Sequence, residues 1–150
     1  MKLTATNLNR FLFFKLPSAF ICGVRVNEIT LEKCVVSVKH RWINQNPFQS
    51  MYFAVQAMAA ELSTGALVML HIQNSNRNIA MLVASNKSKF TKKATGRITF
   101  ICQNVNPIKK AIQNTIETGE GQTFWLQSVG TNENGETVSE MDFEWTIKLK

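Results

Sequence analysis

Glu61 is the side chain in this sequence whose position most needs a chemical explanation. It lies in the middle of the segment NPFQSMYFAVQAMAAELSTGALVMLHI, which is otherwise mostly apolar or small. An ionisable group is rarely buried without a partner. A carboxylate in such a place either takes part in acid–base catalysis or neutralises a buried Arg or Lys in a structural ion pair. The placement alone favours neither use over the other.

The three cysteines, Cys22, Cys34 and Cys102, form neither a metal-binding nor a disulfide pattern. Their number is odd, their spacing contains no C-x-x-C pair, and no histidines cluster near them. A zinc site or a disulfide framework requires such spacing. We therefore predict reduced, buried cysteines and no metal site.

The segment that carries Glu61 is predicted to be one long helix. Asn46–Pro47 is a start signal, and a helix from about Ser50 to Ile72 extends roughly 35 Å. Its apolar residues cover nearly the whole circumference, so protein must surround it. The stretch from about Met51 to Ile72 is long enough to span a bilayer, but a central carboxylate is costly in lipid. We expect a buried core helix and no membrane span.

The segments on both sides of this helix carry the signals of an antiparallel sheet. Apolar and polar residues alternate in VRVNEITLE, in CVVSVKHRW and most clearly in TVSEMDFEWTIKL. One hairpin turn is expected at Leu31–Lys33, and another at Asn134–Gly135, a favoured turn pair. The three tryptophans, Trp42, Trp125 and Trp145, are expected on strands as core or interface aromatics.

Two shorter helices complete the predicted elements. A helix from about Leu3 to Phe14, ended near Pro17, is expected to pack on the body as a lid, and NPIKKAIQNTIETG indicates an amphipathic helix stopped by Gly119. No repeat or linker divides the chain. We therefore predict a single domain over residues 1–150, with residues 1–16 packing on it. The predicted fold class is α+β, an antiparallel sheet wrapped around one long helix.

The net charge favours an anionic partner without naming it. Lys and Arg number 17 against 10 Asp and Glu, which gives +7 at pH 7. Nucleic acid, anionic lipid and a polyphosphate-bearing small molecule all fit this balance. The basic residues are scattered, and only Lys92–Lys93 and Lys109–Lys110 are adjacent, whereas nucleic-acid modules show a dense stripe or interleaved aromatics. We expect no nucleic-acid partner.

We predict that the first residues are not a secretion signal. The start MKLTATNLNRFLFFK contains the apolar run FLFF, but Asn7, Asn9, Arg10 and Lys15 interrupt any apolar core of such a signal. We therefore expect a cytoplasmic protein.

The order of the elements resembles that of a known fold family. Two strands, a long helix and further antiparallel strands, with Asn46–Pro47 followed fifteen positions later by Glu61, resemble the hotdog-fold thioesterases. The segments NPFQSMYFAVQAMAAELSTG, FTKKATGRITF and TGEGQTF are similar to an uncharacterised bacterial branch of that superfamily, a domain of unknown function. In that branch Tyr-Phe-Ala replaces the more common His-Gly-Gly, and the resemblance covers most of the chain.

The resemblance implies hydrolysis of an acyl thioester such as acyl-coenzyme A. It makes Glu61 the carboxylate that attacks the carbonyl or activates water, with Asn46 orienting the water or the carbonyl. Thr64, one turn beyond Glu61, would hold the carboxylate. No resident cofactor is expected, because coenzyme A would be part of the substrate. Its nucleotide end would pass near Lys92 and Lys93.

The resemblance also implies that the start of the helix would supply the oxyanion site. Tyr52, Phe53 and Ala54 stand where His-Gly-Gly is found, and the N–H groups of Phe53 or Ala54 would hold the developing oxyanion. Without the two glycines, the Phe53 and Ala54 side chains narrow the approach to this backbone. Non-catalytic binding of an acyl chain or lipid is therefore the alternative function.

The resemblance also implies a homodimer. Two sheets would join into one continuous sheet with both long helices on one side, because a lone subunit leaves an edge strand unpaired. Further pairing of dimers into tetramers is left open.

Overall fold

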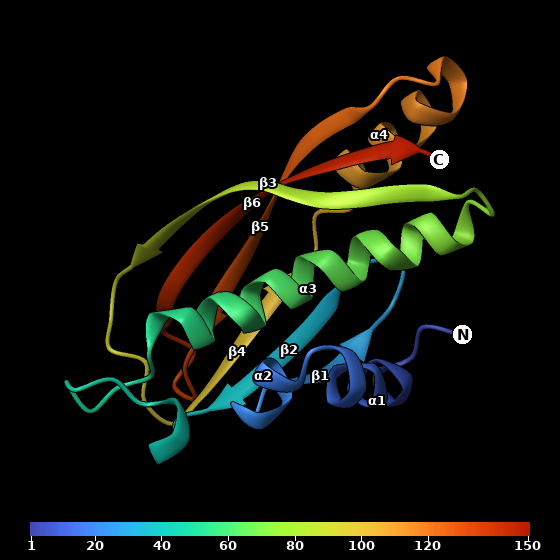
Figure 1. Cartoon of the computed structure of the whole chain (residues 1–150). Helices are drawn as coiled ribbons and strands as arrows, with labels where there is room; N and C mark the ends of the chain where they lie inside the picture. The colour runs from blue at the N-terminus through green and yellow to red at the C-terminus, as the bar shows by residue number, and fades with distance from the viewer.

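One antiparallel sheet of six strands forms the body of the protein. The computed structural model describes all residues, 1–150. The strand order is β1-β2-β4-β5-β6-β3, and every neighbouring pair is antiparallel (Figure 1). The strands are β1 (Arg25–Ile29), β2 (Cys34–Lys39), β3 (Ile79–Phe90), β4 (Arg97–Cys102), β5 (Gln122–Thr131) and β6 (Thr137–Leu149).

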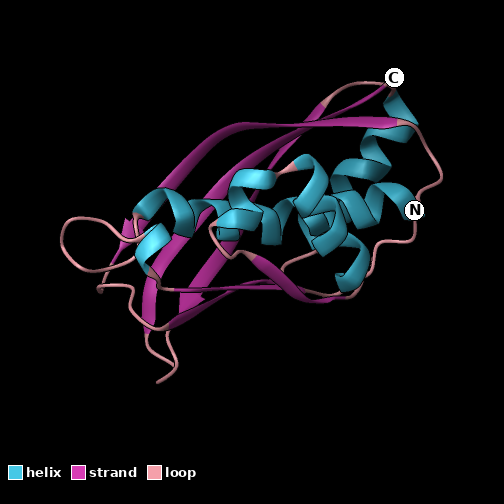
Figure 2. Ribbon diagram, turned by 60° about the horizontal axis from the view of Figure 1, so that its bottom comes forward, coloured by secondary structure: helices cyan, strands magenta, loops and turns pink.

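The longest helix lies along one face of this sheet, and the sheet curves around it (Figures 1 and 2). This arrangement is the predicted α+β hotdog fold. The helices are α1 (Ala5–Lys15), α2 (Pro17–Ile21), the 3-10 helix η1 (Trp42–Asn44), α3 (Phe53–Asn74) and α4 (Asn106–Thr118).

Helix α3 is the core helix of the molecule. Its buried side chains point in all directions around the axis and include Val55, Ala59, Leu62 and Leu67. It is the one helix long and apolar enough to cross a membrane, but most of it is buried inside the molecule. The prediction of a buried core helix is confirmed.

The C-terminal half follows the sequence signals closely. On β6, the residues Met141, Phe143, Trp145 and Ile147 are buried, as their alternation with polar residues predicts. The β5–β6 hairpin turns at Gly135, whose φ of 78° lies in the left-handed region that glycine favours. Helix α4 ends at Gly119, also left-handed, as predicted.

The N-terminal helices cover the β1 edge of the sheet. Leu8 and Leu12 of α1 are buried, so this helix packs on the body. The Asn9 side-chain amide donates to the carbonyl oxygen of Val26 and accepts from the Val26 N–H, both at 2.9 Å. Pro17 does more than end α1, because it is the first residue of α2, a position that suits its fixed φ.

The prediction for Trp42 was wrong. This residue lies in η1, not on a strand, and it is 83% exposed. Strand β2 ends at Lys39, where the buried Asn44 side chain donates to the Lys39 and Cys22 carbonyl oxygens and accepts from the Arg41 N–H. These bonds turn the chain away from the sheet, and the Trp42 ring is left outside.

Two of the three cysteines are buried as predicted, whereas Cys22, just after α2, is only partly buried. Cys34 on β2 and Cys102 on β4 are paired in register, and both are buried. Burial is the largest cause that raises the pKa of the Cys34 thiol to about 12 and that of Cys102 to about 11. Both thiols therefore stay protonated at neutral pH, as expected for packing residues.

Candidate active site

A pocket of about 410 Å³ lies at the N-terminal end of α3. Its walls come from the segment before the helix, the first turns of α3, the end of β3 and the segment after it. Five of the eight predicted site residues line this α3 N-terminal pocket, whereas Ala54, Glu61 and Thr64 do not. The five are Asn46, Tyr52, Phe53, Lys92 and Lys93.

Asn46 shapes the pocket by holding the turn before the helix. Its side-chain oxygen accepts from the N–H groups of Phe48 and Ser50 at 2.9 and 3.2 Å. Its amide nitrogen donates to the Ser50 hydroxyl at 3.0 Å and to the Met51 carbonyl oxygen at 3.4 Å. The amide is thus engaged within the turn, and its contribution to the site is to fix the path of the chain.

The first turn of α3 presents backbone donors to the pocket. Tyr52 is the N-cap residue and provides no side-chain hydrogen bond to the helix. The Tyr52 N–H itself donates to the Asn44 carbonyl oxygen at 2.8 Å, and Val55 and Gln56 donate to the Tyr52 carbonyl oxygen. The N–H groups of Phe53 and Ala54 have no acceptor in the chain. Together with the positive end of the helix dipole, they suit a developing negative charge.

Gln56 is a pocket residue that the sequence analysis missed. It is only 4% exposed, and its amide nitrogen reaches the Met51 carbonyl oxygen at 3.5 Å. Its side-chain oxygen is buried without a hydrogen-bond partner. Buried polar atoms normally have partners. The signal that drew attention to Glu61, a polar residue inside an apolar helix, applies equally to Gln56.

Glu61 has no cationic partner in this chain. It is partly buried on α3, and neither an ion pair nor a side-chain hydrogen bond involves its carboxylate. Burial raises the pKa of the Glu61 carboxyl above its ordinary value. A carboxylate with a raised pKa is a better general base near neutral pH. The structural alternative of an intrachain ion pair therefore loses its support.

Thr64 is attached to the backbone and to β6, away from the Glu61 carboxylate. Its hydroxyl donates to the Glu61 main-chain carbonyl oxygen at 2.9 Å and accepts from the Trp145 indole N–H at 3.0 Å. Both bonds fix α3 against the sheet. Thr64 was expected to hold the Glu61 carboxylate. In the structure its hydroxyl instead accepts a hydrogen bond from Trp145, a residue distant in sequence.

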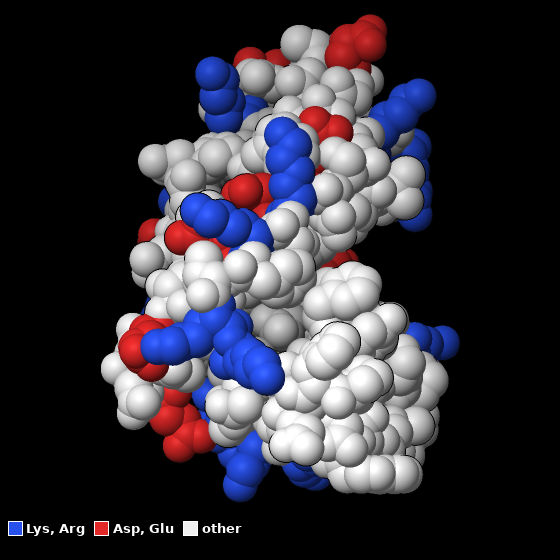
Figure 3. All heavy atoms as spheres, turned by 90° about the vertical axis from the view of Figure 1, so that its left-hand side faces the viewer, with Lys and Arg blue, Asp and Glu red and all other residues white.

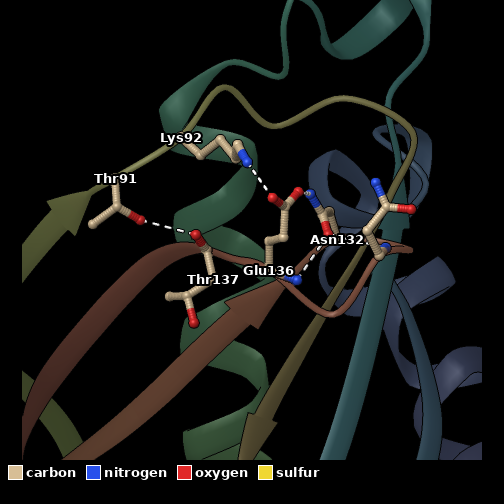
Figure 4. Close-up of polar contacts among 6 residues, drawn as sticks. Thr91, Lys92, Asn132, Glu136 and Thr137 are labelled. Carbon is tan, nitrogen blue, oxygen red and sulfur yellow. Dashed lines mark hydrogen bonds and ion pairs between the residues drawn. The ribbon is translucent and has the colours of Figure 1, made fainter.

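The two lysines at the pocket differ in how far they are neutralised. Lys92 pairs with Glu136, which also accepts from Asn132 (Figure 4). The hydrogen bond from Lys92, followed by that from Asn132, holds the pKa of Glu136 below its ordinary value. Lys93 has no carboxylate partner, and its ammonium group donates to the Phe48 carbonyl oxygen at 3.2 Å. Of the two, Lys93 has the freer charge.

The family of this chain follows from its match to a family model. Residues 4–147 match the model of a family described as a domain of unknown function, DUF4442. The chain belongs to this family. A comparison with curated proteins gives no match for this DUF4442 protein.

Solved structures share the fold of this DUF4442 protein over nearly its whole length. A Pseudomonas aeruginosa protein of unknown function, called a probable thioesterase, is 22% identical with a TM-score of 0.83, covering 97% of this chain and 96% of its own. A Chlorobaculum tepidum protein of unknown function is 16% identical, with a TM-score of 0.84 and coverage of 99% and 98%. A Haemophilus influenzae thioesterase is 12% identical, with a TM-score of 0.77 and coverage of 99% and 93%. At these identities the likeness shows the fold.

The raised pKa of Glu61 makes a prediction about stability. The folded protein holds this proton more tightly than the unfolded chain, so the contribution of Glu61 to wild-type stability falls as pH rises from below the ordinary value of 4.5 through the folded pKa. In Glu61→Gln that loss is absent. Urea denaturation at a series of pH values is expected to show the variant gaining on the wild type as pH rises. The exposed Glu120 offers a control, Glu120→Gln, that should follow the wild type. A loss of roughly 3–5 kcal/mol in Glu61→Gln at neutral pH would instead reveal a buried ion pair.

Proposed function

We propose that the protein hydrolyses acyl thioesters, with acyl-coenzyme A as the substrate class. The observation that carries this proposal is a pair of N–H groups without acceptors at the start of α3, on the helix that also carries an unpaired Glu61. One belongs to Phe53, which lines the α3 N-terminal pocket, and the other to its neighbour Ala54. Solved structures with this fold include proteins called thioesterases. The compartment we propose is the cytoplasm, where free thiols such as those of Cys34 and Cys102 stay reduced.

In the proposed reaction the thioester carbonyl oxygen accepts a hydrogen bond from the Phe53 or Ala54 N–H. The Glu61 carboxylate takes a proton from water, and the water oxygen forms a bond to the carbonyl carbon. The negative charge that develops on the carbonyl oxygen is stabilised by the helix N-terminus. The carbon–sulfur bond then breaks, and the thiolate receives the proton. The products are a carboxylic acid and a free thiol.

The distance along α3 requires a second subunit for this reaction. Phe53 and Glu61 are two turns apart on one helix, about 12 Å along its axis. A carboxylate so far away cannot act on a carbonyl bound at Phe53. The carboxylate that we assign to the reaction is therefore the partner subunit's Glu61, in a homodimer whose α3 helices run antiparallel side by side.

Strand β3 offers the edge for this homodimer. It is a long strand, Ile79–Phe90, paired with β6 on one side only, and its second half is exposed. Antiparallel pairing of two β3 strands would satisfy both open edges and extend the sheet. It would also bring the end of one β3, next to the α3 N-terminal pocket, to the start of the other.

An apolar pocket at the start of β3 suits the acyl chain. Its volume is about 530 Å³, and its lining includes Met69, Ile72, Ile79 and Met81. In the proposed dimer the partner's copy of this pocket lies beyond the α3 N-terminal pocket. The same pocket supports the alternative function, in which the protein binds an acyl chain without hydrolysing it.

Release of free thiol from acyl-coenzyme A esters of increasing chain length tests the activity. We expect turnover by the wild type and a loss of at least about 100-fold in Glu61→Gln, the scale of a lost acid–base group. The Glu120→Gln control should keep full activity. A folded Glu61→Gln variant with unchanged turnover would remove Glu61 from the mechanism. No turnover by the wild type, with acyl ligands raising its melting temperature, would favour the binding function.

Two substitutions at Phe53 test the oxyanion site separately from the side chain. Tyr52 has φ −61° and ψ 134°, a conformation that the residue before proline favours, and Phe53 begins the helix. Phe53→Pro therefore removes the N–H with little cost to the fold, and Phe53→Ala removes only the ring. We expect turnover of Phe53→Pro to be about 100-fold below that of Phe53→Ala. Equal turnover in the two variants would mean that the Phe53 N–H is not an oxyanion donor.

Sedimentation velocity tests the dimer. We expect the wild type to sediment at twice the mass of one chain at micromolar concentration. Leu82, an exposed apolar residue of β3, should be covered in the dimer. Leu82→Lys is therefore expected to shift the protein toward the monomer, and Leu31→Lys, at an exposed site of the β1–β2 turn, is expected to leave it dimeric. A wild-type monomer would contradict the proposed assembly.

A further inference from the structure

Helices α1, α2 and η1 display a set of large apolar side chains that the fold does not bury. Trp42 is 83% exposed and Phe14 is 74% exposed. Monomeric proteins rarely leave so much apolar surface in one region without a use for it. We call this set the aromatic face: Phe13, Phe14, Leu16, Ile21, Trp42 and Ile43.

Contacts connect the elements that carry the aromatic face. The Phe13 ring packs edge-on against Phe14 and Phe20, with centroids 4.8 and 5.1 Å apart. The Asn44 side chain donates to the Cys22 carbonyl oxygen and so ties η1 to the end of α2. In Figure 1, α1 and α2 lie next to each other below the sheet, and η1 is the teal turn further to the left on the same lower side. The proposed dimer edge, β3, is at the opposite edge of the sheet from β1, so dimerisation leaves this face open.

Positive charge is concentrated in the part of the chain that forms this face. Residues 1–60 contain seven Lys or Arg and two Glu, so +5 of the net charge of +7 lies there. The two acids, Glu28 and Glu32, belong to the β1–β2 hairpin and its turn, where they pair with Lys33 and Lys109. The segments 1–27 and 34–60 contain no acid.

The Lys and Arg side chains beside the aromatic face have no acidic partners within the chain. Arg10, Lys15 and Arg41 form no ion pair in the chain. The Arg25 guanidinium lies 3.7 Å from the centroid of the Phe20 ring. Burial, followed by the positive charge of Arg41, lowers the pKa of Arg25. Figure 3 shows a broad uncharged area on the lower half of the molecule, with Lys and Arg side chains along its margins.

We propose that the aromatic face binds the surface of an anionic lipid bilayer. Trp and Phe side chains favour the boundary between headgroups and acyl chains. Lys and Arg side chains around them that have no acidic partner are attracted to anionic headgroups. A nucleic acid would bind the Lys and Arg side chains but would leave Phe14 and Leu16 exposed to water. Helix α1 has 11 residues, with Leu8 and Leu12 in the core, so it is too short to cross the bilayer and the proposed contact is peripheral. The proposal does not depend on thioester hydrolysis.

Co-sedimentation with vesicles tests this proposal. We expect the wild type to bind vesicles of equal parts phosphatidylglycerol and phosphatidylcholine, and to bind phosphatidylcholine vesicles at least about tenfold more weakly. High salt should weaken the binding to anionic vesicles. The double variant Phe14→Ser/Trp42→Ser is expected to bind at least about tenfold more weakly than the wild type. Leu31→Ser, at an exposed apolar site on the hairpin that carries Glu28 and Glu32, is the matched control and should bind like the wild type.

Tryptophan fluorescence provides a second measurement, on variants with conservative Trp→Phe substitutions. Anionic vesicles are expected to shift the emission to the blue in the wild type and in Trp125→Phe, and not in Trp42→Phe. No binding of the wild type to anionic vesicles, or equal binding by the double variant, would overturn the proposal. It would also be overturned if the double substitution left vesicle binding intact and reduced the oligomeric state in free solution, because the face would then join copies of this chain.

Discussion

The structure depends on the need to surround α3. This helix has apolar side chains on all sides, so sheet and loops must cover it, and each buried polar group on it must find a partner inside the protein. Hydrogen bonds connect Ser63 to Ser128, Thr64 to Trp145, and His71 to the Leu31 carbonyl oxygen. The exceptions are Gln56, whose side-chain oxygen is unpaired, and Glu61, whose carboxylate is unpaired. On α3, Gln56 and Glu61 are therefore the polar side chains that remain available for chemistry.

The start of α3 shows the same logic for the backbone. Most helices begin with Ser, Thr, Asp or Asn, whose side chain bonds to an N–H of the first turn. Here Tyr52 stands at that position and makes no such bond, while Asn46 uses its amide to shape the preceding turn. The N–H groups of Phe53 and Ala54 therefore remain without acceptors at the start of the helix. A helix that is poorly capped for stability is in this way well prepared to hold an anion.

Local signals predicted most of the fold, and long-range contacts account for what they missed. The Asn134–Gly135 turn, the β6 alternation and the end of α4 at Gly119 are properties of neighbouring residues, and sequence patterns identified them. Trp42 left the sheet because Asn44 bonds to Cys22, a contact 22 residues away. The Thr64 hydroxyl is hydrogen-bonded to Trp145, 81 residues away, so the helix sequence alone could not predict this partner. The grouping of Asn46 with Lys93 at one pocket followed the family resemblance.

The contacts of Asn9 have a consequence for how many copies can assemble. Its amide occupies both the N–H and the carbonyl oxygen of Val26, so the outer side of β1 is already satisfied at that point by a side chain. A sheet with two open edges can add strands at both ends and grow into a fibril. In this sheet the β1 edge is blocked and the β3 edge is open. Pairing of two copies through their β3 strands therefore leaves no open edge for a third copy. Such an assembly stops by itself and resists polymerisation.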